Sequence, residues 1–185
     1  MRSTVEVDVA APPRLVFELA RDVERWPSLL PHYLDVRVLE RHADGALTAR
    51  MVAVRSIVRG LGYGLPVAWR ARTWSVEPEL QLRFVHRGGA TAGMDVTWRI
   101  EPTPTGCHVS IEHRFDPPLP GWAAFVNRLF VRPIATRTLA TFKAIAEAVA
   151  TEAARPPVAP PAAPVSPSAA RSRRSSPSRS AKKAT

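Results

Sequence analysis

Two histidines lie where a side chain can do acid–base chemistry. His86 and His113 each fall in a segment of alternating polar and apolar residues, on the side that carries the large apolar residues. A histidine on such an inner face can transfer a proton or hydrogen-bond an oxygen near neutral pH. The alternative is an interior or rim histidine with a structural role, so both residues enter the candidate site with this alternative open.

Metal, phosphate and covalent chemistry are not expected. The histidines lack a usual ligand spacing and the single Cys107 cannot build a cysteine cluster, so we expect no metal and no other cofactor. The glycines of residues 60–64 precede a strand-like stretch rather than a helix, which argues against a phosphate-binding loop. They form a gate at a cavity mouth or a simple hairpin turn. No Gly-x-Ser-x-Gly nucleophile motif occurs, so an enzyme of this kind would shape a reactive chain and move protons without a covalent intermediate.

These candidates are positioned by a chain that we predict to form one strand, two short helices, six further strands and a long helix. Strict alternation marks the first strand, Pro12 and Pro13 open a helix, and Pro27 opens a second helix that carries Tyr33. Turn-like segments separate the later strands into an antiparallel meander. The predicted strands are residues 4–9, 36–40, 47–55, 67–76, 80–87, 94–101 and 108–115.

The inner faces of the late strands and one stripe of the final helix predict a core or a cavity. Phe84 and Trp98 are bulky residues on these faces, opposite a helix with several alanines on its inward stripe. Such a pairing leaves room for a ligand, or it alternates large and small side chains in a close-packed core. Pro133 should break or kink the helix near its start. The residues expected to line a ligand cavity are Trp69, Phe84, Met94, Trp98, His113 and Phe142.

Three segments of the chain resemble a known family. They are Ala-Pro-Pro-Arg-Leu-Val-Phe at 11–17, Trp-Pro-Ser-Leu-Leu-Pro-His-Tyr at 26–33 and Gly-Met-Asp-Val-Thr-Trp-Arg-Ile at 93–100. With the order of elements, they resemble the polyketide cyclase/dehydrase, aromatase/cyclase-like group of the helix-grip START-type superfamily over roughly residues 3–150. The resemblance implies an α+β fold in which a curved antiparallel sheet of about seven strands wraps around a long C-terminal helix, with the ligand between them.

The resemblance also implies two further candidate catalytic residues. Tyr33 lies where aromatase/cyclases have a pocket tyrosine that hydrogen-bonds a ligand oxygen; alternatively, it packs half under the sheet with its hydroxyl in water. In those enzymes an arginine on a middle strand is thought to polarise a carbonyl. The nearest candidates here are Arg70 and Arg72, between which the register is unsettled, and Arg72 is the one chosen. An exposed position on the wet side of the sheet is the alternative for Arg72. Together with His86, Tyr33 and Arg72 form the candidate catalytic set.

Composition divides the chain near residue 150. Residues 1–150 hold 19 Lys or Arg and 15 Asp or Glu, a net charge of +4, whereas residues 151–185 hold 7 and 1, a net charge of +6. We expect residues 1–150 to form a ligand-binding domain and residues 151–185 a disordered basic tail. The tail either makes weak contact with anionic membrane or nucleic acid, or only adds solubility. One cysteine, with neither an export signal nor a membrane span in evidence, predicts a cytoplasmic protein.

Three functions remain open at this point. The domain is expected to bind a hydrophobic aromatic or polyketide-like molecule, and polar groups converging in its cavity would indicate a polyketide cyclase or aromatase. A purely apolar tunnel would indicate a noncatalytic carrier of a lipid or quinone. A filled core would indicate a protein that binds a partner or nucleic acid through its basic tail. The ligand and the oligomeric state are left open.

Overall fold

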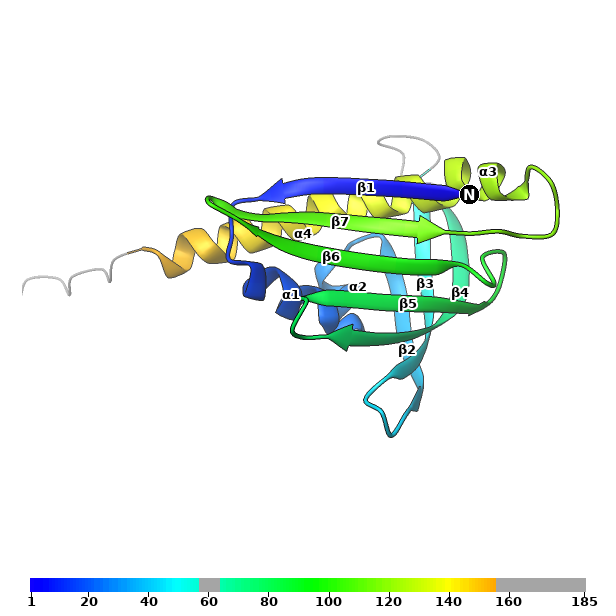
Figure 1. Ribbon diagram of the computed structural model, residues 1–185, viewed down its shortest axis with the longest axis horizontal. Helices are drawn as coiled ribbons and strands as arrows, with labels where there is room; N and C mark the ends of the chain where they lie inside the picture. Colours follow the sequence, from blue (N-terminus) through cyan, green and yellow to red (C-terminus); the bar gives the residue numbers. More distant parts are fainter. Residues whose placement is uncertain (57–63, 156–185) are drawn as a thin grey trace, which may run out of the picture. The chain divides into compact units, whose positions relative to one another are not determined.

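The computed structural model describes residues 1–56 and 64–155 and confirms the α+β class (Figure 1). Within these ranges seven strands form one sheet, and a long helix follows the last strand. The helical and strand elements are β1 (Arg2–Val9), α1 (Pro13–Arg21), the 3-10 turn η1 (Val23–Arg25), α2 (Trp26–Leu29), β2 (Tyr33–Arg41), β3 (Leu47–Ser56), β4 (Gly64–Val76), β5 (Gln81–Gly88), β6 (Asp95–Thr103), β7 (Gly106–Arg114), α3 (Trp122–Val126), the π-helical segment η2 (Asn127–Val131) and α4 (Arg132–Ala153).

The sheet is antiparallel throughout and has the order β1-β7-β6-β5-β4-β3-β2. Strands β2 to β7 form the predicted meander, and β1 pairs with the last strand. Figure 1 shows β2 and β3 running across the direction of β5, β6 and β7, so the sheet is strongly bent. The long strand β4 joins the two parts, and its register against β5 shifts between Arg70 and Ala71. Such a bulge bends a strand and increases its twist, which gives the sheet its concave side.

Alternation along the strands produces one buried and one solvent-facing side. On β6, Val96, Trp98 and Ile100 are buried, while the residues between them are at least partly exposed. Trp98 lies opposite Ile111 of β7, which is also buried. Since side chains alternate between faces with a period of two, these pairs place one apolar face on the concave side of the sheet, as predicted.

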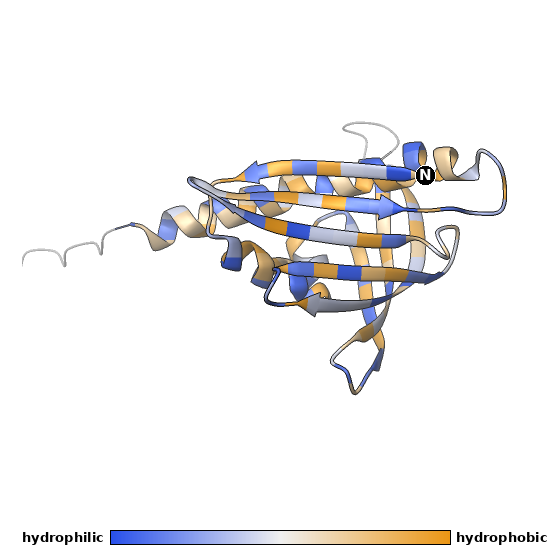
Figure 2. Cartoon of the chain, in the orientation of Figure 1, coloured by the Kyte–Doolittle hydropathy of each residue, from blue (hydrophilic) through white to orange (hydrophobic). Residues whose placement is uncertain are grey.

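Helix α4 covers this apolar face. Pro133 is the second residue of α4 and follows the π-helical segment η2 directly, and without an N–H it cannot donate the backbone hydrogen bond of a continuous helix. The predicted interruption near Pro133 is therefore the junction between η2 and α4. Figure 2 shows apolar and polar residues alternating along the strands beside α4. The buried residues of α4 are Ala135, Thr138, Leu139, Phe142 and Ala146, at helical spacing.

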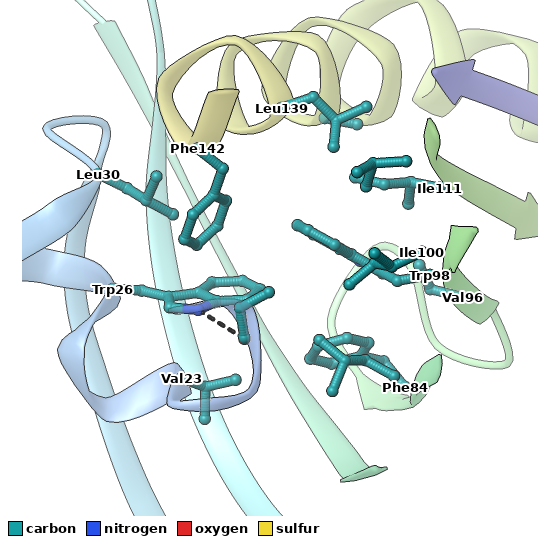
Figure 3. Close-up of a cluster of buried hydrophobic side chains, with 14 of the residues drawn as sticks. Val23, Trp26, Leu30, Phe84, Val96, Trp98, Ile100, Ile111, Leu139 and Phe142 are labelled. Carbon is teal, nitrogen blue, oxygen red and sulfur yellow. Dashed lines mark hydrogen bonds between the residues drawn. The ribbon is translucent and has the colours of Figure 1, made fainter. Parts of the chain in front are cut away.

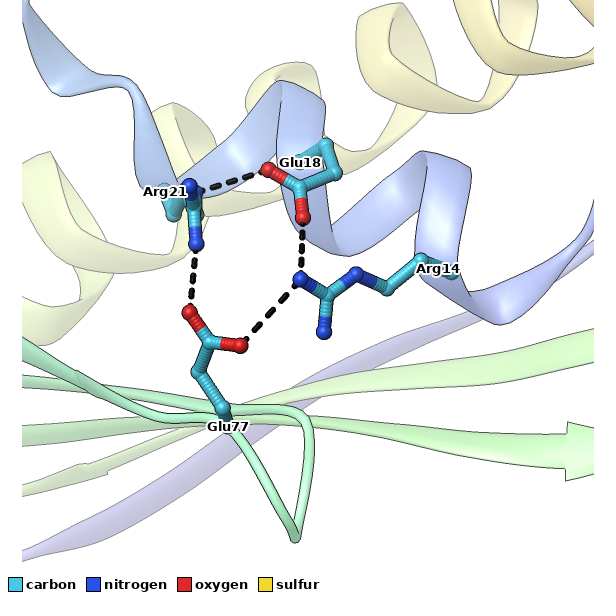
Figure 4. A network of polar contacts seen from close by, with 4 residues as sticks. All are labelled: Arg14, Glu18, Arg21 and Glu77. Carbon is cyan, nitrogen blue, oxygen red and sulfur yellow. Dashed lines mark hydrogen bonds and ion pairs between the residues drawn. The ribbon is translucent and has the colours of Figure 1, made fainter.

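An ion-pair network fixes α1 against the turn after β4 (Figure 4). Arg14 and Arg21 both contact the Glu18 carboxylate on α1 and the Glu77 carboxylate of the turn, at 2.6–3.2 Å. The hydrogen bond from Arg14 lowers the pKa of Glu77 below its ordinary value. The same two guanidinium groups lie 5.4 and 5.9 Å from the ring centre of buried Phe17. The network therefore closes the end of the core where α1 meets the sheet.

Two details differ from the sequence-based expectation. The second helix ends at Leu29, and Tyr33 begins β2 instead of ending that helix. Leu30 has extended backbone angles because Pro31 follows it, and a residue before proline avoids the helical region. Helix α4 continues to Ala153, slightly past the predicted boundary at residue 150.

Some expectations concern other parts of the chain. The glycine-rich segment is described only from Gly64 onward, so its role as a gate or a turn lies outside the described residues. Residues 156–185, which make up most of the predicted tail, also lie outside them. Among the helices that the structure describes, none combines the length and the apolar character needed to cross a membrane.

Candidate functional site

A cavity of about 80 Å³ lies between the concave face of the sheet and the start of α4. Its lining comes from every strand except β1, from α2, and from the η2–α4 junction. Most of the lining residues are apolar or aromatic, and the polar ones carry no formal charge when the histidines are neutral. The lining residues are Trp26, Tyr33, Met51, Val67, Trp69, Phe84, His86, Thr91, Met94, Val96, Trp98, Ile111, His113, Phe130, Val131, Ile134, Ala135 and Thr138.

Trp26 is the centre of an aromatic cluster on one side of this cavity (Figure 3). Its ring centre lies 5.0 Å from that of Tyr33, 5.8 Å from Phe84, 5.7 Å from Trp98 and 5.9 Å from Phe142. The indole N–H donates a hydrogen bond of 3.0 Å to the Ala20 carbonyl, which satisfies the one polar group of this buried side chain. Rings packed at these distances form a rigid apolar wall.

His86 contributes a polar group to the cavity lining. Its ring stacks on Trp69 with the ring centres 5.8 Å apart, and its Nδ1 lies 2.7 Å from the Thr91 hydroxyl oxygen. Burial lowers the pKa of His86 to about 3, and the nearby His113 lowers it further when charged. His86 is therefore neutral near pH 7 and acts as a hydrogen-bonding group.

His113 lies on β7 and is only 7% exposed. Burial lowers its pKa to about 4, although a hydrogen bond with the Ser3 backbone acts in the opposite direction. The buried Nδ1 atom has no hydrogen-bond partner among the residues that the structure describes. In the neutral ring this atom is either an acceptor or an N–H donor, depending on the tautomer.

A third polar group joins the sheet to α4. The Thr138 hydroxyl donates to the Ile134 carbonyl at 2.9 Å and lies 2.8 Å from His32 Nε2, which must therefore be the donor. A side-chain hydrogen bond also links Thr138 to Tyr33. Burial raises the pKa of the Tyr33 phenol far above its ordinary value, so it stays protonated. Tyr33 and Thr138 thus present uncharged hydroxyl groups at the cavity.

The structure brings most of the predicted site residues together. Seven of them line the cavity, namely Tyr33, Trp69, Phe84, His86, Met94, Trp98 and His113. Phe142 is buried beside the cavity and is not one of its lining residues; its ring lies 5.9 Å from that of Trp98. Phe142 therefore packs behind the aromatic side chains that line the cavity.

Arg72 is a correction to the predicted site. It lies outside the cavity, on the solvent-facing side of β4, and its guanidinium forms an ion pair with the Asp44 carboxylate. The neighbours Ala71 and Thr73 are buried and occupy the inner face. Arg70 lies two residues from Arg72 and therefore also faces outward. Neither arginine faces the cavity, because residues two apart on a strand share a face.

Eleven of the eighteen lining residues were not among the predicted site residues, and Thr138, Trp26 and Thr91 are three of them. Thr138 shares the helical stripe of Leu139 and Phe142, so its helical spacing could have indicated it. Trp26 lies in a single helical turn, and Thr91 lies in the turn after β5, where no periodic pattern exists. Only the tertiary structure brings Trp26 and Thr91 to the cavity. No group of three or more His, Cys, Asp or Glu able to hold a metal ion occurs in residues 1–56 and 64–155.

Comparisons with known proteins agree with this architecture. A family model described as polyketide cyclase / dehydrase and lipid transport matches residues 9–143. A putative polyketide cyclase from Streptomyces halstedii is 32% identical over 103 residues, which span 55% of this chain and 88% of that protein. A putative polyketide cyclase from Streptomyces cyaneus is 28% identical over 130 residues, which span 66% of this chain and 82% of that protein.

A solved structure shares the fold. The crystal structure of the Zhui aromatase/cyclase from Streptomyces sp. R1128 superposes with a TM-score of 0.65 at 18% identity, covering 80% of this chain and 93% of that one. At this level of identity, the similarity concerns the arrangement of the sheet and the helix.

Proposed function

Because the chain belongs to the polyketide cyclase / dehydrase and lipid transport family, we propose that it binds a largely apolar, uncharged small molecule in the cavity under α4. The observation that carries the proposal is His113, whose buried Nδ1 atom has no hydrogen-bond partner among the described residues. A buried polar atom left unpaired costs free energy that a hydrogen bond with a ligand would recover. Because a hydroxyl group can both donate and accept, the proposed ligand is an apolar molecule that carries a hydroxyl group.

The electrostatics of the lining support an uncharged ligand. Among residues 1–56 and 64–155, the side chains that line the cavity include no Asp, Glu, Lys or Arg, and the low pKa values of His86 and His113 keep both neutral near pH 7. An anionic or cationic group would lose its hydration here without gaining a partner of opposite charge. The cavity should therefore discriminate against carboxylates and sulfonates of otherwise similar shape.

The cavity volume constrains how such a ligand would enter. Sites for drug-sized ligands measure roughly 300–1,000 Å³, whereas this cavity measures about 80 Å³. A ligand of two or more rings would therefore require lining side chains to move. Phe130 and Ile134 are only half-buried and lie at the η2–α4 junction, so they are better placed to move than the fully enclosed Trp26.

A polyketide cyclase or aromatase is the second candidate function, because uncharged hydrogen-bonding side chains from β2, β5, β7 and α4 converge on one cavity. An efficient proton acceptor has a pKa near the working pH, and with pKa values of about 3 and 4 His86 and His113 are weak bases at pH 7. In this candidate function the protein would act chiefly by holding a chain with several oxygens so that two of its carbons meet. A carrier would use the same cavity without this step.

A pair of matched probes tests the proposal. 1-Naphthol and naphthalene differ by one hydroxyl group, and their binding can be followed by quenching of tryptophan emission, since Trp26, Trp69 and Trp98 line the cavity. We expect the wild-type protein to prefer 1-naphthol by about 2- to 10-fold, the range of one net hydrogen bond. The variant His113→Leu should lose this preference and still bind naphthalene.

The matched control is Arg72→Gln, which changes a polar residue on the other face of the sheet and should retain the preference. A wild-type protein that binds neither probe would contradict ligand binding in this cavity. An unchanged preference in a folded His113→Leu protein would contradict the assigned role of Nδ1. Native mass spectrometry of the purified protein would then identify any copurified molecule.

A further inference from the structure

An exposed aromatic surface lies on α3 and η2, at the end of the sheet where β7 stops (Figure 1). Leu119 is 61% exposed and Phe125 is 51% exposed, two of the largest apolar exposures among the described residues. The Trp122 ring stacks on Phe125 with the centres 5.4 Å apart, and Phe130 contacts Phe125 edge-on at 6.4 Å. We call Leu119, Trp122, Phe125 and Phe130 the aromatic face.

The local structure holds the aromatic face in place. Gly121, the residue before α3, has a φ of +79°, a conformation that glycine adopts without strain. The Trp122 indole N–H donates a hydrogen bond of 3.1 Å to the Ala90 carbonyl, which ties α3 to the turn after β5. Val126 is fully buried on the inner side of the same helix. The exposure of Phe125 is therefore built into the fold, and a contiguous exposed apolar surface of this kind marks an interaction site.

Charge indicates the kind of partner. Residues 117–146 contain four basic residues and no acidic one. Arg128 follows Phe125 by three residues and Arg132 follows Arg128 by four, a spacing that places neighbours on one side of a helix, and both are exposed. A second copy of the chain docked through the same surface in a symmetric dimer would bring these positive charges together. Aromatic and aliphatic side chains bordered by arginines instead fit the interface of an anionic lipid bilayer.

The aromatic face is also continuous with the cavity. Phe130 belongs to both, since it contacts Phe125 and lines the cavity together with Val131 and Ile134. We propose that the aromatic face docks on the surface of an anionic membrane, with Leu119 and Phe125 inserted at the level of the headgroups and the first carbons, and Arg128 and Arg132 against the phosphates. This contact places the η2–α4 junction, where the half-buried Phe130 and Ile134 line the cavity, next to the lipid.

The test uses the full chain and vesicles of phosphatidylcholine with roughly one-third phosphatidylglycerol. The double variant Leu119→Gln with Phe125→Gln should bind these vesicles about 10-fold or more weakly, because it removes both apolar anchors. Its matched control is Leu34→Gln with Leu39→Gln, which removes two leucines that are 59% and 48% exposed on β2. The control should bind like the wild-type protein. In the wild type, Trp122 should give a blue-shifted emission on binding, which the first variant loses.

The contribution of the two arginines to vesicle binding is tested in the same way. The double variant Arg128→Gln with Arg132→Gln should lower binding about 10-fold at low salt, since each arginine near an anionic surface contributes to affinity. Its matched control, Arg37→Gln with Arg70→Gln, removes two exposed arginines from the sheet and should bind normally. Circular dichroism of all four proteins establishes that the fold is retained.

The basic residues beyond position 155 provide the strongest competing explanation. If they alone bind the vesicles, high salt should abolish binding entirely, since purely electrostatic contacts are screened. We expect instead that part of the binding survives high salt and disappears in the Leu119→Gln, Phe125→Gln variant. Equal loss in a control pair, or a wild-type dimer that this variant dissociates, would overturn the proposal. Binding of 1-naphthol should be unchanged in the Leu119→Gln, Phe125→Gln variant, because neither mutated residue lines the cavity.

Discussion

Lowering the pH from about 7.5 to about 5 should destabilise the folded protein through its buried histidines. His113 has a pKa of about 4 in the folded protein against an ordinary value of 6.5, and buried His32 has a pKa of about 4. For a histidine whose pKa is lowered by folding, the unfolded chain takes up a proton first as the pH falls. Stability is therefore present above pH 6.5 and is lost between about pH 6.5 and 4.

The size of the loss follows from these values. At pH 5 an unfolded histidine is almost fully protonated and the folded His113 is mostly neutral, a difference that corresponds to ~2 kcal/mol relative to pH 7.5. His32 contributes an amount of the same order, and His86 acts in the same direction. Against a total stability of ~5–15 kcal/mol for an ordinary domain, this loss should be easy to measure.

Urea unfolding followed by tryptophan fluorescence at the two pH values gives the free energy of unfolding for each protein. The variant His113→Gln should show a pH-dependent loss that is smaller than the wild-type loss by ~2 kcal/mol, because glutamine does not titrate. The variant His108→Gln is the control, since Asp8 raises the pKa of that partly exposed histidine and its effect has the opposite sign. A His113→Gln protein with the same pH-dependent loss as the wild type would refute the reasoning about burial.

Three further predictions concern the cavity, the sheet and the chain beyond α4. Trp98→Ala should lower the free energy of unfolding by ~3–5 kcal/mol, since Trp98 is only 4% exposed. Trp98→Phe should fold, and its altered 1-naphthol affinity would place Trp98 at the ligand; an unchanged affinity would make it ordinary core. Arg72→Gln should leave both the melting temperature and 1-naphthol binding nearly unchanged, because its pair with Asp44 is at the surface. Truncation after Arg155 should also leave the melting temperature nearly unchanged, and a loss of several degrees would show that the removed residues pack on the domain.

The parts of the fold that could be predicted from sequence are the strands in which apolar and polar residues alternate with a period of two. Alternation in β6 and β7 placed Trp98 and His113 on one face, and the structure confirms that face because a sheet with one wet side imposes a period of two. The same pattern extended to β5, where Phe84 and His86 face inward. Most of the cavity lining comes from such strands, which explains why most of it could be named.

The incorrect predictions concern segments in which the pattern of apolar and polar residues does not fix the element or its inner face. Arg70 and Arg72 alternate with small residues such as Ala71, and Trp69 and Trp74 lie on opposite faces of β4, so hydropathy does not fix the inner face of this strand. Tyr33 was predicted at a helix end, although Pro31 shortens that helix and leaves the tyrosine in β2. The Tyr33 side chain nevertheless reaches the cavity, because β2 lies over the same concave face.

The correction of Arg72 changes the chemistry that the proposed site can perform. An arginine in the cavity would have polarised a ligand carbonyl with a full positive charge, and without it the lining from the described residues offers only uncharged donors and acceptors. The low pKa values of His86 and His113 remove the other source of positive charge at neutral pH. A site of this kind gains affinity from apolar contact and specificity from a few hydrogen bonds, which suits the uptake of an uncharged molecule from an apolar phase. The basic aromatic face beside the η2–α4 junction would place such a phase, the membrane, next to the cavity, so ligand binding and membrane docking become two steps of one proposed process.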